Sequence, residues 1–503
     1  MREATNLARI SLLRMTARPI GALLLVLAAA LAACAVLGHL ALPADGWDAE
    51  QTAAGSRHLL ISAAITAGAG LLGLLASWKV PFQVGRREAL FVVGTVWLSL
   101  GIFGAIPFVI GAGMRIPDAL FEAFSGVTTT GGTILTEIEG SLSAPLHLWR
   151  MAAQWLGGLG IVVLFVALFP EMGVGGKRLF QGEAAGPTTA GLSPRIRDTA
   201  RNLLWIYLSI TAVAMVTLRV CGLPWFDALA TSLSTLGTGG FAIKNGSIGE
   251  YNSLSVNVVV TGFMLMAGTN FSLFHRARTE GMSVFWRNPE FRLYAMLFLG
   301  ISTVIAMDLS TSGLADSAGN AVSYSTFQVA AIMTGTGFGT ADFEQWSTVS
   351  KVLLVTLFFT GGCAGSTSGG MKLMRLLIIF KVIVHEMRLA FRPSLVAPVR
   401  VGAQVVPEGV VRGTMAYALI FLATVGTTSL IVAVLDPVDM TTAFMASLAC
   451  VANVGPGLGA VGPTDNYAFF SDASKLVLSA AMLLGRLEFF SLLVLFVPGF
   501  WRR

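Results

Sequence analysis

The sequence predicts an all-α integral membrane protein in which four pseudo-repeats of helix, re-entrant pore helix and helix surround one pore, preceded by two extra N-terminal transmembrane helices. Composition is the first reason: of 503 residues, 55% are hydrophobic and 12% are charged, whereas soluble domains carry roughly 25% charged residues. The second reason is a series of apolar segments long enough to cross a bilayer. The third is a glycine- and threonine-rich stretch that recurs four times between those segments.

The charged and cysteine residues exclude other classes of protein. A net charge of +6 would suit nucleic-acid binding, but Lys and Arg lie in short loops between apolar segments, where the positive-inside bias puts them. The four cysteines have no spacing typical of a metal site or a disulfide framework. No paired acid and base, metal set or activated nucleophile lies at membrane depth. We therefore expect no enzyme and no cofactor bound by this chain.

Ten apolar segments are candidates for membrane crossings, because a spanning helix needs about 20 mostly apolar residues. The first is too long for the core of a signal peptide, so we interpret it as a retained helix. Arginines precede the first crossing and follow the last, which places both termini on the cytoplasmic side of the inner membrane. Basic and acidic loops alternate along the chain in agreement with this topology. The crossings are predicted at 20–42, 58–78, 88–111, 147–169, 201–221, 254–274, 291–309, 347–384 (interrupted), 413–435 and 474–498.

Shorter apolar runs lie between some crossings and predict re-entrant segments. They cover 117–128, 224–236, 323–334 and 440–451, and each is followed at once by Gly and Thr. Such runs are too short to span a bilayer. Non-helical backbone survives at membrane depth only where protein or water satisfies its polar groups. Four such segments therefore predict an aqueous cavity that all of them face.

The four segments are copies of one repeat. Asp118-Ala119-Leu120 precedes the first glycine-rich stretch, and Asp227-Ala228-Leu229 precedes the second in the same register. The aligned glycines recur roughly every 100 residues, which is a sequence signature of internal repetition. The predicted organisation is 1–85 (two N-terminal helices), 86–178 (repeat 1), 179–280 (repeat 2), 281–395 (repeat 3, with a broken second helix) and 396–503 (repeat 4).

Glycine and threonine are the residue types that a potassium filter needs. Rings of backbone carbonyls replace the hydration shell of a dehydrated potassium ion, and glycine permits the unusual backbone angles that aim them inward. The bland alternative, that these glycines mark close helix packing, fits one copy better than four aligned ones. The predicted K⁺-binding residues are Thr129, Thr130, Gly131, Thr238, Gly239, Gly240, Gly335, Thr336, Gly337, Asn453, Val454 and Gly455.

Five carboxylates lie just outside this predicted filter: Glu137, Glu139, Asp342, Glu344 and Asp465. They could raise the local cation concentration, although solvated loop carboxylates are ordinary features of membrane proteins.

The interrupted crossing predicts a gate. Its glycine-rich break contains Gly361, Gly362, Gly365, Gly369 and Gly370, and each glycine costs a helix about 1 kcal/mol against Ala. A broken transmembrane helix belongs beside a water-filled cavity. The alternative is a cytoplasmic loop between two separate helices, which would spoil the alternation of charge.

Arg486 is predicted to act with this break. It precedes Phe500 by about 14 residues, or roughly 21 Å at helical rise, which is too deep for easy snorkelling. Intramembrane ionisable residues usually face a cavity and mark function. Glu488 does not share its helix face, and a structural salt bridge elsewhere is the alternative.

In these motifs the chain resembles the superfamily of K⁺ transporters that contains TrkH, TrkG and KtrB. The resemblance rests on "TTTGG", "TGGF", "GTGFGTADF", "NVGPGLG", "GGCAGSTSGGMK" and "GRLEFF", and the two extra N-terminal helices favour the TrkH branch. It implies potassium uptake through a channel-like pore, a membrane homodimer and a cytosolic nucleotide-binding regulatory subunit of the TrkA type. The first quarter lacks the aromatic residue that follows the third, and Pro456 stands there in the fourth.

An ion-coupled secondary transporter, moving K⁺ with H⁺ or Na⁺, is the alternative function. Transporters also use repeats and broken helices, but here successive repeats share one orientation and each brings its own re-entrant segment.

Overall fold

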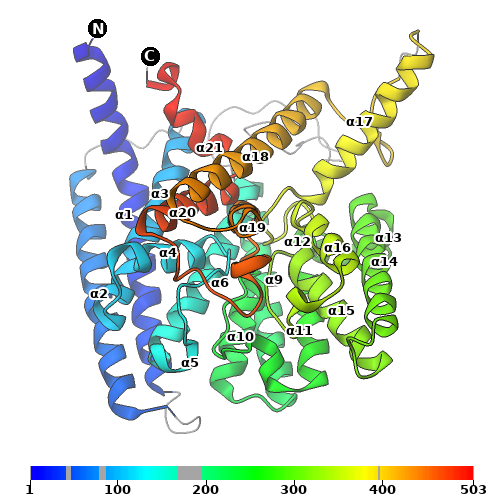
Figure 1. Ribbon diagram of the computed structural model, residues 1–503. Coiled ribbons are helices and arrows are strands. Elements are labelled where there is room, and N and C mark those ends of the chain that lie inside the picture. Colours follow the sequence, from blue (N-terminus) through cyan, green and yellow to red (C-terminus); the bar gives the residue numbers. More distant parts are fainter. Residues whose placement is uncertain (1, 41–46, 79–85, 168–193, 395–396, 502–503) are drawn as a thin grey trace.

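The computed structural model describes residues 2–40, 47–78, 86–167, 194–394 and 397–501. These residues are mostly helical, and both ends of the described chain lie at the same end of the molecule (Figure 1). The predicted inner-loop residues Lys79, Lys177 and Arg178 lie outside the described residues.

The helices form an N-terminal pair and four successive units, and each unit holds an outer helix, a short pore helix and an inner helix. The pair is α1 (Arg2–Leu40) and α2 (Ala49–Ala76). The first unit is α3 (Arg86–Ala112), α4 (Ile116–Val127), α5 (Ile138–Ser141) and α6 (Ala144–Ala167). The second is α9 (Pro194–Val220), α10 (Trp225–Gly237), η1 (Ser247–Tyr251), α11 (Leu254–Ala267), α12 (Phe271–Glu280) and α13 (Ser283–Arg287).

The third and fourth units follow the same order. The third is α14 (Pro289–Thr311), α15 (Ala318–Met333), η2 (Phe343–Gln345), α16 (Thr348–Phe358) and α17 (Leu373–Phe391). The fourth is β1 (Arg400–Val401), β2 (Gln404–Val405), α18 (Glu408–Leu435), α19 (Met440–Ala452), η3 (Gly459–Val461), α20 (Asp472–Arg486), α21 (Phe490–Leu493), η4 (Val494–Phe496) and η5 (Pro498–Trp501).

The four pore helices, α4, α10, α15 and α19, are arranged in a closed ring. Each packs against the outer and inner helices of its own unit. Each also packs against the inner helix of the preceding unit: α10 against α6, α15 against α11, α19 against α16, and α4 against α20. Because the last contact joins the fourth unit to the first, the packing has no free edge and encloses a central axis.

Six described helices are long and apolar enough to cross a membrane, and two bent pairs raise the number to eight. The six are Thr16–Leu40, Ala49–Ala76, Arg87–Ala112, Asp198–Val220, Pro289–Thr311 and Glu408–Leu435. The pore helices begin and end within a few residues of the four predicted re-entrant runs.

The segments predicted to cross at 254–274 and 474–498 are apolar enough to span as bent pairs, but neither is a single regular helix, because each contains a sharp bend. The chain turns by 90° between α11 and α12 and by 110° between α20 and the α21–η4 segment. Asn270 begins α12 as an N-cap and accepts a hydrogen bond from the Ser272 N–H (2.9 Å). At the second bend Glu488 and Phe489 have positive φ. Each bent pair as a whole is long and apolar enough for one span, so the apolar pattern alone could not separate its halves.

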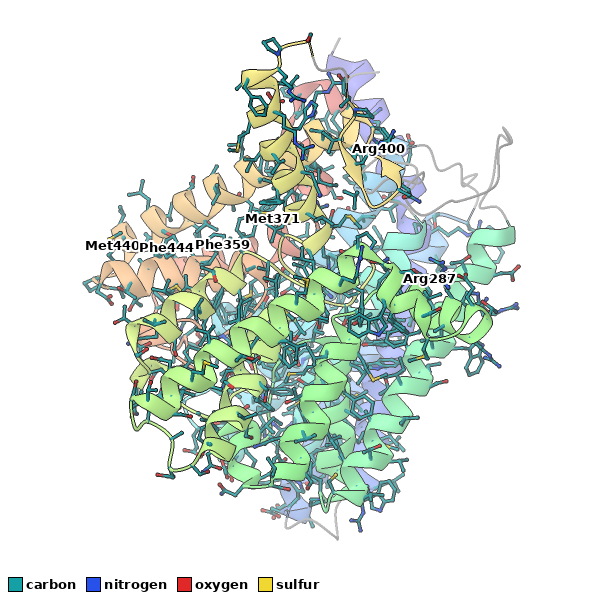
Figure 2. All side chains as sticks on the ribbon, turned by 90° about the vertical axis from the view of Figure 1, so that its right-hand side faces the viewer. Arg287, Phe359, Met371, Arg400, Met440 and Phe444 are labelled. Atoms are coloured by element: carbon teal, nitrogen blue, oxygen red, sulfur yellow. The ribbon has the colours of Figure 1, made fainter. Side chains whose placement is uncertain are left out.

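The sequence predicted no strand, but the structure contains a two-stranded antiparallel hairpin, β1–β2. Its register pairs Arg400 with Val405 and Val401 with Gln404. Val401 is buried in a cluster with Ile378 of α17. In Figure 2 the hairpin residue Arg400 lies beyond Met371, toward the projecting end of the molecule, whereas Arg287 lies on the body of the molecule. Two-residue strands are too short to show the alternating pattern of a β-strand.

The N-terminal pair packs through small residues. A β-carbon on Gly21 would lie 2.7 Å from the Gly70 carbonyl oxygen, so the two backbones touch there. Close backbone approach of this kind supplies packing energy between helices in lipid, where no hydrophobic force acts between them. α1 and α2 also contact α3 and α6, which fixes the pair to the first unit.

The ends of two pore helices rest on glycines of inner helices. A β-carbon on Gly157 of α6 would lie 1.9 Å from the Val127 carbonyl oxygen, and one on Gly485 of α20 would lie 1.9 Å from the Val451 carbonyl oxygen. The position of α4 therefore depends on the absence of a side chain at residue 157.

Replacing Gly157 with Ala should destabilise the protein, because the new methyl group would push α4 away from α6. Overpacking a core typically costs about 1–3 kcal/mol, which lowers the melting temperature of a protein this size by a few degrees. Gly160→Ala is the matched control, since its β-carbon would meet only the Trp97 ring at 3.6 Å. Equal melting temperatures of the two variants in detergent would contradict this packing.

Candidate functional site

The twelve residues predicted as a filter form four triplets, one after each pore helix. We number them by unit: Thr129-Thr130-Gly131, Thr238-Gly239-Gly240, Gly335-Thr336-Gly337 and Asn453-Val454-Gly455. The structure brings all four together at the centre of the ring of pore helices.

Every triplet starts with the same helix-ending turn. The N–H of its first residue donates to the carbonyl three residues back, and the N–H of its middle residue donates to the carbonyl five residues back. In the first triplet these bonds run from Thr129 to Gly126 and from Thr130 to Ser125, both 2.9 Å, and the other three repeat them at 2.8–3.2 Å. This pair of bonds is the Schellman motif. It uses the N–H groups of the triplet and leaves its carbonyls free.

The backbone of the four triplets alternates in the same way. The first residue has positive φ in each: Thr129 57°, Thr238 52°, Gly335 69° and Asn453 54°. The third residue, always glycine, also has positive φ, between 78° and 93°. Left-handed conformations cost L-residues roughly 1–2 kcal/mol, so three of the first residues hold a strained conformation that their surroundings impose.

The third glycines close the triplets into a ring. A β-carbon on Gly131 would lie 2.1 Å from the Gly239 oxygen, and one on Gly240 would lie 2.0 Å from the Thr336 oxygen. The same test gives 2.0 Å from Gly337 to the Val454 oxygen and 2.5 Å from Gly455 to the Thr130 oxygen. Each third glycine therefore abuts the middle carbonyl of the next triplet, and the fourth abuts the first.

Most of the triplet carbonyls have no hydrogen-bond partner. Among the described residues, only Gly239 and Gly455 accept a bond, from the Gln154 Nε2 (2.6 Å) and the Tyr467 hydroxyl (2.7 Å). The other ten carbonyls accept none from that part of the chain. Buried carbonyls are usually paired, so a group of ten around one axis is suited to binding a dehydrated cation.

All four units line a cavity on one side of the triplets. Its walls include the third glycine of each triplet, together with Arg150, Lys244, Asp465 and Tyr467. We call it the entrance cavity.

Of the five predicted carboxylates, only Asp465 lines the entrance cavity. Glu139 pairs with Lys244 (3.4 Å), and Glu137 binds the Asn245 side chain. Glu344 accepts from the Gly459 N–H (3.3 Å), and Asp342 accepts from the Glu344 N–H (3.0 Å). These four carboxylates hold the loops around the entrance cavity.

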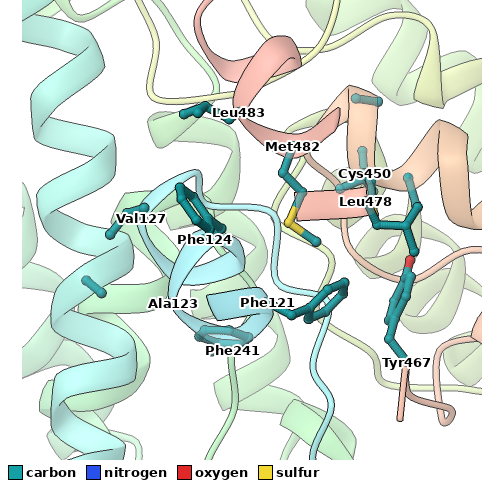
Figure 3. Close-up of a cluster of buried hydrophobic side chains, with 14 of the residues drawn as sticks. Phe121, Ala123, Phe124, Val127, Phe241, Cys450, Tyr467, Leu478, Met482 and Leu483 are labelled. Carbon is teal, nitrogen blue, oxygen red and sulfur yellow. The ribbon is translucent and has the colours of Figure 1, made fainter. Parts of the chain in front are cut away.

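Aromatic rings and a buried ion pair support the triplets from behind. Phe121 of α4 and Tyr467 point toward each other, with ring centroids 5.1 Å apart (Figure 3). Arg150 donates from its Nε to Glu122 at 2.8 Å, with both side chains fully buried, and its guanidinium lies 4.1 Å from the Phe241 ring centroid. Removing one partner of such a buried pair strongly destabilises a protein, because the other charge is left unpaired. Since Glu122 lies on α4 and Arg150 on α6, the pair fixes these two helices against each other.

The predicted gate loop lies inside the protein, against the opposite side of the triplets. Residues 359–372 separate α16 from α17, and most of them are buried, which favours an intramembrane loop over a cytoplasmic one. A β-carbon on Gly369 would lie 2.7 Å from the Asn453 Cβ, and one on Gly335 would lie 3.5 Å from the Ser368 Oγ. The loop thus lies directly below the first residues of the third and fourth triplets. Its glycines at 361, 365 and 370 have positive φ.

The bend between α11 and α12 holds this loop. The Cys363 N–H donates to the Gly268 oxygen (2.8 Å), and the Phe271 N–H donates to the Gly365 oxygen (3.1 Å). Breaking the helix frees these backbone groups, and the loop satisfies them, as membrane depth requires. The Oε1 of Glu290, which is buried on α14, accepts two further bonds, from the N–H groups of Ala364 (2.7 Å) and Met374 (3.0 Å).

Arg486 fastens the loop from the other side. Its guanidinium donates to the Thr367 oxygen at 2.8 Å and to the Gly157 oxygen at 3.1 Å, and only 2% of the residue is exposed. Among the described residues no carboxylate pairs with it, because Glu488 pairs with Arg375. The structure thus places Arg486 and the five predicted gate glycines in one assembly.

Three functional candidates were not predicted from the sequence: Gln154, the Glu122–Arg150 pair and Glu290. Glu122 and Arg150 lie in the predicted segments 117–128 and 147–169, where intramembrane charge is a signal that could have found them. Glu290 lies one residue before the predicted crossing 291–309, so that signal did not mark it. Gln154 carries no such signal, because its role depends on a contact between different units.

A family model for TrkH, described as a cation transport protein, matches residues 59–502. The Trk system potassium uptake protein TrkH of Salmonella typhimurium is 38% identical over 428 residues, which cover 84% of this chain and 87% of that protein. TrkH of Escherichia coli is 37% identical over 442 residues, covering 86% and 90%. The crystal structure of the potassium transporter TrkH from Vibrio parahaemolyticus matches with a TM-score of 0.86 at 31% identity, covering 97% of this chain and 99% of that one. The family match includes all four triplets, the loop and Arg486.

Proposed function

Since the chain belongs to the TrkH family of cation transport proteins, we propose that it takes up potassium through a channel-like pore whose filter is the four triplets. The observation that carries this proposal is the set of ten triplet carbonyls around the axis that accept no hydrogen bond from the described residues. Carbonyl rings replace the hydration shell of potassium. The pore helices direct their C-terminal ends, which carry partial negative charge, toward the same place. The membrane is the cytoplasmic (inner) membrane, with both termini inside.

The path of the ion runs from the entrance cavity through the triplets to the 359–372 loop. The 359–372 loop lies across this path, and Arg486 holds the loop by donating a hydrogen bond to the Thr367 carbonyl. A fixed positive charge near the path opposes a cation: two unit charges at about 4 Å and an effective dielectric of 20 repel by about 4 kcal/mol. Opening requires the loop to move aside, which its glycines permit.

Replacing Gly240 or Gly337 with Ser should lower the selectivity for K⁺ over Na⁺. The new side chain would collide with the Thr336 or Val454 oxygen and strain a residue with a φ of 78°. The measurement is the K⁺/Na⁺ permeability ratio in liposomes. Gly339→Ser is the matched control, because its β-carbon has no neighbour closer than 3.9 Å.

Unchanged selectivity in both filter variants would refute the assignment of the triplets. In the same liposomes, K⁺ flux should follow the K⁺ gradient alone. A flux driven by an imposed proton or sodium gradient would favour the coupled transporter instead.

Replacing Arg486 with Ala should raise the basal K⁺ flux, as should deletion of 361–370. Loss of a barrier of about 4 kcal/mol corresponds to an increase of up to roughly three decades. Arg486→Lys keeps the charge but cannot readily make both carbonyl bonds, so it separates electrostatic from tethering effects. Wild-type basal flux in both the folded Arg486→Ala protein and the deletion variant would exclude this gate.

We further propose that the chain works as a membrane homodimer with a cytosolic nucleotide-binding regulatory subunit of the TrkA type. The expected contact surface is the basic inner face near 276–292, where Arg278 and Arg287 lie; the other expected segment, 171–200, lies largely outside the described residues. The subunit should co-purify under mild conditions from native membranes, and Arg278→Glu with Arg287→Glu should weaken its binding. Retention of the subunit by this double variant would exclude the surface.

A further inference from the structure

The second triplet differs from the others at its middle position. Gly239 stands where the other triplets have Thr130, Thr336 and Val454. The φ of Gly239 does not lie in the left-handed region, unlike that of Gly240. Its backbone would therefore accept a side chain, and the reason for glycine must lie in the space beside it.

That space is filled by Gln154 from α6, the inner helix of the preceding unit. A β-carbon on Gly239 would lie 2.2 Å from the Cδ, 2.4 Å from the Oε1 and 2.6 Å from the Cγ of Gln154. Gln154 is fully buried. Its side chain thus occupies the volume that the side chain of the middle residue would need.

The Gln154 amide also binds the second triplet through three hydrogen bonds. Its Nε2 donates to the Gly239 oxygen at 2.6 Å. Its Oε1 accepts from the Ser234 hydroxyl (2.8 Å) and from the Phe241 N–H (3.2 Å). These partners lie before, within and after the triplet, so one side chain fixes the whole turn.

The middle residues of the first and third triplets carry hydroxyl groups that bond a second hydroxyl of their own unit, and Thr130 also accepts from the Asn453 side chain (2.9 Å). Thr130 pairs with Thr128 at 2.8 Å, and Thr336 pairs with Thr334 at 2.7 Å. The second triplet has a hydroxyl at Thr238, but that group bonds the Gly237 oxygen instead (2.7 Å). Support for the middle of the second triplet therefore comes from another unit.

We propose that Gln154 is a positioning residue for ion selectivity: it replaces the missing side chain of Gly239 and holds the carbonyl of that residue at its place in the ring. The proposal rests on the proposed function, since it assumes that the triplets select potassium. The Gly239 oxygen is also the atom that abuts Gly131 of the first triplet, so a shift of this carbonyl would disturb two walls of the pore.

The first experiment removes the hydrogen bonds and keeps the volume. Gln154→Leu should conduct potassium with a K⁺/Na⁺ permeability ratio about fivefold below wild type, the factor that loss of one ordinary hydrogen bond corresponds to. Gln328→Leu is the matched control. Gln328 is also fully buried and donates to a backbone carbonyl, that of Ala341 (3.2 Å), which lies outside the triplets. Both variants should lose thermal stability, but only Gln154→Leu should lose selectivity.

The second experiment exchanges the two side chains. Gly239→Thr alone should fail to fold or lose selectivity, because the threonine collides with Gln154. Gly239→Thr combined with Gln154→Ala should regain stability and part of the wild-type permeability ratio, because the collision is removed and the second triplet then has the Thr-Thr-Gly sequence of the first. The recovery should be partial because Gly237 stands where the first unit has Thr128, the hydroxyl partner of Thr130. If Gln154→Leu does not fold, this double variant still tests whether Gln154 replaces the missing side chain of Gly239.

Wild-type selectivity in folded Gln154→Leu would overturn the proposal, as would a Gly239→Thr protein that is normal by itself or a double variant no better than Gly239→Thr. A wild-type protein that does not distinguish K⁺ from Na⁺ would instead refute the proposed function. In that case the melting temperatures of the single and double exchange variants would still show whether the two side chains share one space.

Discussion

The whole architecture depends on one contact repeated four times, in which a glycine of one triplet touches a carbonyl oxygen of the next. No side chain fits between these backbones, so the four triplets must approach at van der Waals distance and in a fixed register. The Schellman turns deliver each triplet to that register. Around the triplets, each pore helix packs on the inner helix of the preceding unit, so the helices follow the same cyclic order as the triplets. Every level of the structure thus repeats one cyclic relation.

Much of this was predictable because glycine identity and apolar length are local properties. The aligned glycines predicted the register of the four triplets, and the structure gives those residues matching φ values. The bends at 268–270 and 487–489 were not predictable from hydropathy. The first exposes backbone groups that bond the 359–372 loop, and the second redirects the chain. Neither role requires a change in average polarity. Gln154 was missed for a related reason. Its proposed role depends on the missing side chain of Gly239, which lies in another unit 85 residues away, so the residues next to Gln154 in the sequence carry no sign of it.

The four units share a plan but differ in how they support the pore. The first uses the buried Glu122–Arg150 pair, and the fourth uses the Tyr467 hydroxyl on Gly455. The inner helices differ more strongly: α6 is continuous, whereas those of the other three units are broken at the level of the triplets. The breaks all lie on the side away from the entrance cavity. The two sides of the ring therefore differ in their backbone: the helix breaks lie on one side and the entrance cavity on the other.

The ring has a seam where the end of the chain meets its beginning. Asn453 donates to the Thr130 hydroxyl (2.9 Å), and these residues are 323 positions apart. During synthesis the first three units can enter the membrane and fold their helices, but they supply only eight of the ten carbonyls that accept no hydrogen bond from the described residues, and the ring stays open until the fourth unit arrives. Closing so long a loop carries an entropic cost and delays contacts of this kind to the end of folding. The ring of triplets is therefore completed only by the last unit to be made, and the contact across its seam is the last of the four to form.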